Sequence, residues 1–306
     1  MAGPQVSIII PFINEYDYLR EAMQSVMDQE LTDFELIVVG NAADPPAPGQ
    51  IEIKGGNIQI LHEPTSGSAF ARNTGLKAAA GIWIQFLDVD DVLLPGKIRR
   101  QMETPDADVV VSPHVYQFLN GRQEKSKWLA EDVWVGLLNS GLGSTSSMLW
   151  KRDALNAIGG WNTNFQSHQE YELLFRILQA GKKIKLLDRA DTIVRERRSG
   201  AITQTSKPVR NMEGINLREL MWNYIDTQGL GTPARENAFL QYLFRQLRGL
   251  YRMDSFLALE KYRERFHQKK FIPADIHIPG YTLMYRVLNF KWTETIISWW
   301  ISSKLL

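Results

Sequence analysis

The sequence predicts an α/β fold, with a mostly parallel sheet and flanking helices, followed by a helical C-terminal extension. Short apolar runs rich in β-branched residues alternate with segments of helical periodicity up to about residue 200. This alternation is typical of right-handed βαβ crossovers, which build parallel sheets. Around residues 200–210 the alternation ends, and helices rich in aromatic and basic residues follow. We therefore expect two domains, residues 1–205 and 206–306.

The N-terminal elements are predicted from apolar runs and chain breakers. Val6–Ile10 is a continuous β-branched run closed by Pro11, as expected of a buried parallel strand. Asn14 is a candidate N-cap for the amphipathic helix that follows and ends near Gln29. Later elements are strands at 34–39, 58–61 and 83–87, a proline-rich loop at 40–50, and a helix of small residues at 69–80.

The alternation continues through the second half of this domain. Strands are predicted at 107–112, 148–150, 183–187 and 192–195, with an edge hairpin at 115–128. Helices are predicted at 131–139, 152–158 and 169–180. The extension adds helices at 211–227, 233–250, 253–268 and about 282–303.

Composition excludes several classes of partner and site. The formal net charge of the 306 residues is +1, so no nucleic-acid partner is expected. The absence of cysteine excludes disulfides and thiolate metal sites. The N-terminus lacks the features of a signal peptide, and no run approaches the roughly 20 apolar residues of a membrane span. We expect a cytoplasmic protein, either free or peripheral at the inner face of the membrane.

An acidic run, Asp88-Val89-Asp90-Asp91, directly follows the apolar strand at 83–87. Carboxylates at the end of a buried strand are costly to desolvate and repel one another, so a cation is expected there. Oxygen donors without clustered histidines favour Mg²⁺ or Mn²⁺. The alternative is that Asp90 and Asp91 cap a helix starting near Leu94. Ligands of open α/β sheets bind at the carboxyl edge, where we also expect segments 11–15, 40–44 and 141–147.

Five motifs occur in a characteristic order: VSIIIPFINE, FELIVV, SGSAFARNTGLKAAAGIWIQFLDVDD, GGWN and QEYELLFRI. Over about residues 5–200 the chain thereby resembles the family 2 glycosyltransferases. The resemblance implies a GT-A (Rossmann-like) fold and an inverting, metal-dependent transfer from a nucleotide sugar, with a UDP-sugar as first candidate. It implies that the acidic run is a DxD motif in which Asp88 and Asp90 hold the divalent metal and Asp88 also reaches the ribose.

The resemblance also implies a nucleotide-sugar site built from several loops. Its residues are Pro11, Phe12, Ile13, Asn14, Glu15, Asn41, Arg72, Asp88 and Val89. Two of these depart from the family pattern. Ile13 stands where an aromatic ring often stacks on the base, and Asn41 stands where an aspartate often binds it. An amide can both donate and accept, so Asn41 fits uracil or another base, and the identity of the nucleotide stays open.

Glu170 is the general base that the resemblance implies. The family usually has a Glu-Asp pair at this helix start, whereas this chain has Gln169-Glu170. A base is needed because an inverting transferase must deprotonate the acceptor hydroxyl. Two alternatives remain: Glu170 is an ordinary first-turn acid favoured by the helix dipole, or His168 is the base.

The acceptor side is predicted from position and from the resemblance. Ser144 and Thr145 lie in the small, polar segment 141–147, whose glycines allow close approach. Trp161 matches the family's acceptor-side loop and either stacks on a sugar or belongs to the core.

Aromatic and basic residues recur at the C-terminal end, including Trp292, Trp299, Trp300, Arg286 and Lys291. Such a surface packs on the transferase domain, forms a homodimer, or contacts a membrane as a peripheral helix.

We therefore expect a glycosyltransferase of the hexosyltransferase type with a Mn²⁺ or Mg²⁺ cofactor. The expected partners are a nucleotide sugar and a saccharide or lipid-linked acceptor, and the expected product is a surface polysaccharide or glycolipid. Two other classes of function remain open. One is a catalytically silent nucleotide- or glycan-binding module, and the other is an oligomeric scaffold assembled through the C-terminal helices.

Overall fold

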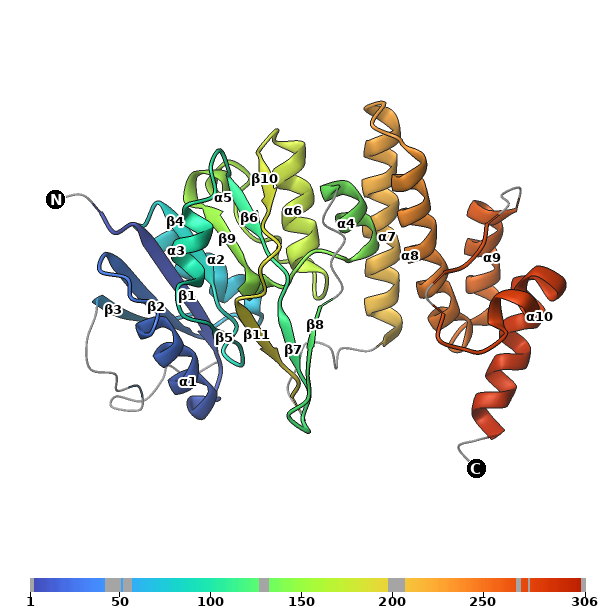
Figure 1. Cartoon of the computed structure of the whole chain (residues 1–306), viewed down its shortest axis with the longest axis horizontal. Coiled ribbons are helices and arrows are strands. Elements are labelled where there is room, and N and C mark those ends of the chain that lie inside the picture. The colour runs from blue at the N-terminus through green and yellow to red at the C-terminus, as the bar shows by residue number, and fades with distance from the viewer. Residues whose placement is uncertain are drawn as a thin grey trace. The chain divides into compact units, whose positions relative to one another are not determined.

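The computed structural model of the chain describes residues 3–41, 51, 57–126, 132–197, 207–267, 271–274 and 276–303. The chain divides into two compact units, residues 1–137 with 141–204 and residues 138–140 with 205–306. Figure 1 shows a unit of sheets and helices followed by a unit of helices alone. Five predictions fall partly outside the described residues: the loop at 40–50, the hairpin at 115–128, the helices at 131–139 and 253–268, and the boundary at 200–210.

The first unit contains a seven-stranded sheet of order β10-β6-β9-β4-β1-β2-β3. Its strands pair in parallel, except that β9 is antiparallel to both β4 and β6. The prediction of a mostly parallel sheet is confirmed. The strands are β1 (Val6–Phe12), β2 (Phe34–Gly40), β3 (Asn57–His62), β4 (Trp83–Phe86), β6 (Val109–Val111), β9 (Met148–Lys151) and β10 (Ile184–Leu186).

A second, four-stranded sheet has the order β5-β11-β7-β8. It consists of β5 (Val92–Leu93), β11 (Thr192–Arg195), β7 (Val115–Gln117) and β8 (Gln123–Lys125). Antiparallel β7 and β8 form the predicted hairpin. Strand β11 runs antiparallel to β5, and this pairing brings residues 192–195 beside the segment that follows the acidic run.

The helices of the first unit lie close to their predicted ranges. They are α1 (Tyr16–Met27), α2 (Ser68–Ala78), α3 (Lys97–Met102), α4 (Val133–Asn139), α5 (Arg152–Ala157) and α6 (Gln169–Gln179), with a 3₁₀ turn η1 (Thr145–Ser147). Two predicted caps are wrong. Glu15, not Asn14, occupies the N-cap position of α1. No helix starts near Leu94, because α3 begins only at Lys97, after Gly96 at φ 74°.

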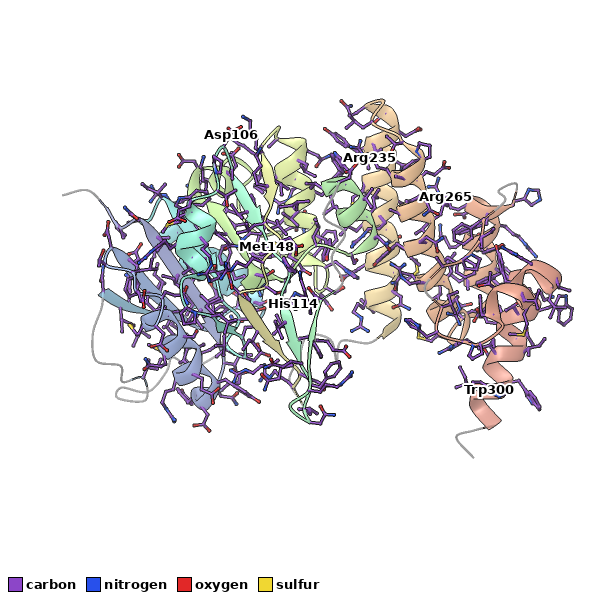
Figure 2. All side chains as sticks on the ribbon, in the orientation of Figure 1. Asp106, His114, Met148, Arg235, Arg265 and Trp300 are labelled. Carbon is purple, nitrogen blue, oxygen red and sulfur yellow. The ribbon has the colours of Figure 1, made fainter. Side chains whose placement is uncertain are left out.

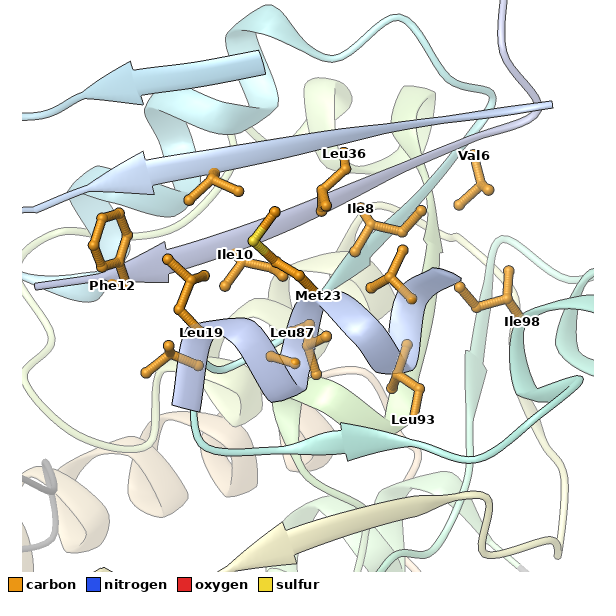
Figure 3. Packing of buried hydrophobic residues seen from close by; sticks show 14 of the residues in the cluster. Val6, Ile8, Ile10, Phe12, Leu19, Met23, Leu36, Leu87, Leu93 and Ile98 are labelled. Carbon is orange, nitrogen blue, oxygen red and sulfur yellow. The ribbon is translucent and has the colours of Figure 1, made fainter. Parts of the chain in front are cut away.

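The core of the first unit contains an apolar cluster and, apart from it, buried polar side chains such as Lys97. Met23 of α1 belongs to the same buried cluster as Ile8 and Ile10 of β1 (Figure 3). Burying such side chains contributes roughly 1.5–3 kcal/mol each. Figure 2 marks Met148, where β9 begins. Its carbonyl accepts a hydrogen bond from the buried Lys97 Nζ at 3.3 Å.

The second unit contains α7 (Lys207–Thr227), α8 (Pro233–Tyr251), α9 (Ser255–Phe266) and α10 (Tyr281–Ser303). Phe244 of α8 lies at the centre of its aromatic core. The rings around it belong to Tyr262, Phe266, Phe271, Tyr281, Tyr285 and Phe290. Among the described helices, none combines the length and the apolar character needed to cross a bilayer.

Candidate functional site

Several chain segments meet at the carboxyl edge of the seven-stranded sheet. The parallel strands β1, β2 and β4 end there, and the antiparallel β9 begins there. The backbone N–H of Asn41 donates to Phe12 O at 2.7 Å, which joins the loops after β2 and β1. The backbone N–H of Asp88 donates to Ser146 Oγ at 3.0 Å, which joins the acidic run to η1. The expected gathering of these segments at one edge is therefore present.

The loop after β1 exposes two of its five predicted site residues. Ile13 and Asn14 face solvent, whereas Pro11 and Phe12 are buried in the strand end. Glu15 fixes the loop, since its Oε2 accepts from the backbone N–H of Ile13 at 2.9 Å and of Asn14 at 3.1 Å. Burial opposes ionisation, but these bonds and the Arg197 guanidinium lower the pKa of Glu15 below its ordinary value. Glu15 is thus a carboxylate fixed in place by two backbone N–H groups and the Arg197 guanidinium.

Asn41 is buried and its amide is fully engaged. Its Nδ2 donates to the carbonyls of Glu63 at 3.2 Å and Thr65 at 2.6 Å. Its Oδ1 accepts from the backbone N–H of Gly67 at 2.8 Å. These bonds orient the loop before α2. A nucleotide base would have to displace them to be read by this side chain, so a role for Asn41 in base recognition stays a prediction.

Arg72 connects the acidic run to the start of α6. Its Nη2 forms an ion pair with Asp88 Oδ1 at 2.6 Å, and its Nη1 donates to Gln169 Oε1 at 3.0 Å. The guanidinium also lies 4.5 Å from the centre of the Trp161 ring. Only 4% of the Arg72 side chain is exposed, against 34% of Asp88. A buried, forked cation therefore fixes Asp88 and leaves part of its carboxylate open.

Asp90 contacts two arginines: Arg195, the last residue of β11, and Arg197, which follows that strand. Arg197 Nε lies 3.5 Å from Asp90 Oδ2, and Arg195 Nε donates to the Asp90 backbone carbonyl. The same Arg197 donates through Nη2 to Glu15 Oε1 at 2.8 Å. Burial and the charge of Asp88 raise the pKa of Asp90 to about 6, although the arginines act in the opposite direction. Asp90 is therefore a largely buried carboxylate whose charge Arg197 offsets only in part.

The other members of the acidic run have structural roles. Asp91 is buried, and its Oδ1 accepts from the backbone N–H of Arg195 at 3.4 Å. Burial and the charges of Asp88 and Asp90 raise its pKa well above the ordinary value. The helix-cap alternative for Asp90 and Asp91 is wrong, since the next helix starts six residues later without a side-chain cap. Val89 is 5% exposed and packs in the apolar cluster, so only its backbone is open to a ligand.

Asp88 and Asp90 fit a Mg²⁺ or Mn²⁺ ion that keeps water and bridges to phosphates, because such ions need only one or two protein carboxylates. Burial and, second, the charge of Asp88 raise the pKa of Asp90, and a divalent ion held by the two carboxylates would counteract both effects. Within the described ranges, no group of three or more acidic or histidine side chains forms a complete cage. The two carboxylates would therefore hold the ion together with a phosphate ligand.

Glu170 lies in the first turn of α6, beside the residue that Arg72 contacts. His168 occupies the N-cap position at φ 55°, and Gln169 donates through Nε2 to Phe165 O at 2.7 Å. Gln169 also accepts from Ser68 Oγ at 3.1 Å. The helix start is thus fixed in place. Glu170 is half-buried there and follows Gln169, which Arg72 contacts, and its role as base stays a prediction.

The predicted acceptor residues are more buried than expected. Thr145 is 6% and Trp161 3% exposed, and Trp161 packs edge-on against Phe86 and Trp150. Trp161 therefore belongs to the core, and the sugar-stacking alternative is not supported. Ser144 is half-buried. In segment 141–147, a Cβ on Gly143 would lie 2.1 Å from Ser112 O, so this glycine serves backbone packing.

Sequence reasoning did not find Arg195, Arg197, Gln169 or Ser146. The basic run from Arg195 to Arg197 follows a short strand and resembles a solvated charge cluster in one dimension. Only the long-range pairing of β11 with β5 brings it to Asp90. Gln169 stands in the sequence only as a departure from the family's Glu-Asp pair, and its bond to Arg72 depends on the tertiary fold.

Comparisons with known proteins identify the family and the fold. A family model described as glycosyl transferase family 2 matches residues 7–169. The uncharacterized glycosyltransferase EpsJ of Bacillus subtilis is 36% identical over 104 residues, which cover 33% of this chain and 30% of that protein. An uncharacterized glycosyltransferase of Haemophilus influenzae is 24% identical over 182 residues, 57% of this chain and 62% of that one. The matches thus span less than two thirds of either relative.

Solved structures resemble the chain over more of its length. The crystal structure of S. aureus TarS 1-349 covers 82% of this chain and 74% of its own, with a TM-score of 0.57 and 19% identity. The structure of S. aureus TarS 1-349 in complex with UDP-GlcNAc covers 98% of this chain and 92% of its own, with a TM-score of 0.54 and 14% identity. The structure of mannosyltransferase PcManGT from Pyrobaculum calidifontis, in complex with GDP-Man and Mn²⁺, covers 97% of this chain and 86% of its own. Its TM-score is 0.56 and its identity is 15%. These similarities show the fold.

Proposed function

Because the chain belongs to glycosyl transferase family 2, we propose that it transfers a sugar from a nucleotide sugar to an acceptor hydroxyl, with inversion at the anomeric carbon. The observation that carries the proposal is the bridge made by Arg72. This one guanidinium binds Asp88 of the acidic run and Gln169, the neighbour of the candidate base Glu170. It links the donor side of the site to the helix from which a base would act.

The donor side is formed by the loops after β1 and β4. Asp88 and Asp90 would hold a divalent ion, with Mn²⁺ the first candidate, against the diphosphate of the donor. Such an ion, when bound, offsets the charge of the departing nucleoside diphosphate. Exposed Ile13 and Asn14 would contact the nucleoside, and Arg72 would keep Asp88 oriented toward it.

Glu170 is the proposed general base. Its carboxylate would accept the proton of the acceptor hydroxyl as that oxygen attacks the anomeric carbon from the face opposite the leaving diphosphate. One displacement of this kind inverts the carbon. Gln169 cannot ionise, so it does not compete for the proton, and its bonds to Arg72 and Phe165 hold the helix start rigid.

We further propose a hexosyltransferase activity with a UDP-sugar as donor, and a saccharide or lipid-linked acceptor used in surface polysaccharide or glycolipid synthesis. UDP-GlcNAc and UDP were crystallised with TarS, and GDP-Man with PcManGT, so the fold accommodates both nucleotides. The location expected from the sequence, the cytoplasm or the inner face of the membrane, stays a prediction.

Isothermal titration of UDP and of GDP, each with and without Mn²⁺, tests the donor class and the metal requirement together. We expect one nucleotide to bind at least tenfold more tightly with Mn²⁺ than without it. Tighter binding of GDP would correct the donor but keep the reaction. If neither nucleotide binds under either condition, the enzyme proposal fails, and of the alternatives only a glycan-binding module or an oligomeric scaffold remains.

A further inference from the structure

Helix α10 has apolar side chains on two opposite faces. Tyr285, Phe290 and Ile297 point into the second unit and are buried. The other face is exposed to solvent, and we name it the α10 apolar face. It consists of Leu283 (67% exposed), Val287 (73%), Trp292 (54%), Ile296 (42%), Trp299 (73%) and Trp300 (44%). Helices of globular proteins normally carry polar residues on the side facing water, so this face is unusual.

These residues recur at helical spacing on both sides of a break in the helix. Leu283 and Val287 are four residues apart, and Trp292, Ile296 and Trp299 follow at intervals of four and three. The break is at Asn289, at φ 64° and ψ 178°, and Figure 1 shows the change of direction within α10. Figure 2 marks Trp300 near the end of the second arm. The spacing produces continuous stripes on each arm.

The exposed charges on α10 all have one sign. Arg286 and Lys291 are exposed, and both are basic. The one acid in residues 281–303, Glu294, is fully buried, where it accepts from Arg248 Nε at 2.6 Å and from the Tyr281 hydroxyl. Along the described length of α10, the solvent-facing side therefore carries apolar and basic residues with the uncharged Asn289 and Thr295, and no acidic residue.

This charge pattern distinguishes between two candidate partners for the α10 apolar face, a second copy of the chain and a lipid surface. In a symmetric homodimer the same patch meets itself, which would place Arg286 and Lys291 of two copies together with no exposed acid on α10 to pair with them. An anionic lipid surface offers the missing negative charge, which attracts basic residues near it. Tryptophan side chains also favour the region between lipid headgroups and acyl chains.

We propose that the α10 apolar face binds the surface of an anionic lipid bilayer as a peripheral contact. The helix lies in the plane of the interface, with the three tryptophans inserted at headgroup depth and Arg286 and Lys291 against lipid phosphates. The contact is formed by the second unit alone and does not depend on sugar transfer. It would concentrate the protein at a surface that carries lipid-linked acceptors.

Co-sedimentation of the full chain with vesicles tests this contact. We expect binding to phosphatidylcholine vesicles containing phosphatidylglycerol, with weaker binding to pure phosphatidylcholine and at raised salt. The double substitution Trp292→Ser with Trp299→Ser should weaken binding at least tenfold, and Arg286→Glu with Lys291→Glu should abolish the preference for anionic lipid. Phe256→Ser is the matched control, since Phe256 is apolar and 80% exposed on α9, and it should keep full binding.

Thermal unfolding of each variant checks that the fold persists, which is expected because the replaced side chains are exposed. Failure of the intact chain to bind anionic vesicles would overturn the proposal. Binding that the tryptophan substitutions leave unchanged would overturn it as well. Light scattering that shows a dimer lost on Trp299→Ser, without vesicle binding, would assign the face to a second copy instead. Nucleotide titration is independent of all these outcomes, so failure here leaves the transferase proposal standing.

Discussion

Arg72 Nη2 lies 2.6 Å from Asp88 Oδ1, and the opposite nitrogen of the same guanidinium lies 3.0 Å from Gln169 Oε1. One nearly buried side chain therefore orients both the acidic run and the start of α6. Its position over the Trp161 ring adds a cation–π contact to these bonds. The catalytic geometry proposed above depends on this residue more than on any other that does not itself react.

Replacing Arg72 by lysine should lower kcat by between about 10-fold and 100-fold. Lysine keeps the positive charge but replaces the planar fork by one ammonium, which cannot occupy the positions of both Nη1, bonded to Gln169, and Nη2, bonded to Asp88. Arg72→Ala should lose still more activity and also destabilise the fold, because it empties a buried position. Steady-state kinetics and thermal unfolding measure the two effects separately. An Arg72→Lys enzyme with unchanged kcat would show that the bridge has no positioning role.

Asp90→Asn should abolish stabilisation by Mn²⁺. A ligand that binds the folded state at 100 times its Kd stabilises a protein by about 2.7 kcal/mol, so the wild-type Tm should rise when Mn²⁺ is added. The variant lacks the carboxylate proposed to hold the ion, and its Tm should stay constant. Asp106→Asn is a suitable control, because Asp106 is ion-paired with Lys183 at the surface. Loss of the Mn²⁺ effect in the control would contradict the assignment.

Arg197→Ala should tighten Mn²⁺ binding measured without nucleotide, by at least about threefold. The guanidinium lies 3.5 Å from Asp90 Oδ2 and 2.8 Å from Glu15 Oε1, where it repels an incoming cation. Arg189→Ala removes an arginine that pairs with Asp191 instead and should leave the affinity unchanged. Equal or weaker Mn²⁺ binding by Arg197→Ala would show that Arg197 does not oppose the ion.

His114 should make the fold sensitive to mild acid. Burial lowers its pKa from 6.5 to about 4, so between these values the unfolded chain binds a proton that the folded chain does not. The free energy of unfolding should therefore fall as the pH falls through this window, by up to roughly 3 kcal/mol. Urea unfolding at pH 7 and pH 4.5 measures the change. His114→Gln should show a smaller change, and an equal one would assign the acid sensitivity to other groups.

Much of the site could be predicted from local sequence. The β-branched runs at 6–10 and 34–39 identified adjacent parallel strands, and the rule that ligands bind at the carboxyl edge placed the acidic run beside the first loop. These predictions worked because each depends on a segment of the chain and on a general topological rule.

Other features depend on contacts that no local pattern encodes. Arg197 reaches Asp90 only through the pairing of β11 with β5, about a hundred residues apart in sequence. Lys97 stands in a basic stretch with Arg99 and Arg100, as surface residues often do, yet it is buried and donates to Gln85. The sequence left two alternatives for Trp161, a place in the core or stacking on a sugar. Its packing against Phe86 in the folded chain shows that it belongs to the core.

The central claim is that Glu170 removes the acceptor proton while Asp88 and Asp90 serve the donor. The most direct measurement compares Glu170→Gln with the wild type in two assays: release of nucleoside diphosphate from the nucleotide sugar, and titration of the nucleotide with Mn²⁺. His168→Gln tests the rival base and should stay active. We predict that Glu170→Gln loses about 10²–10⁴-fold in rate and binds the nucleotide with unchanged affinity. Transfer within a few-fold of wild type, or loss of nucleotide binding, would contradict the claim.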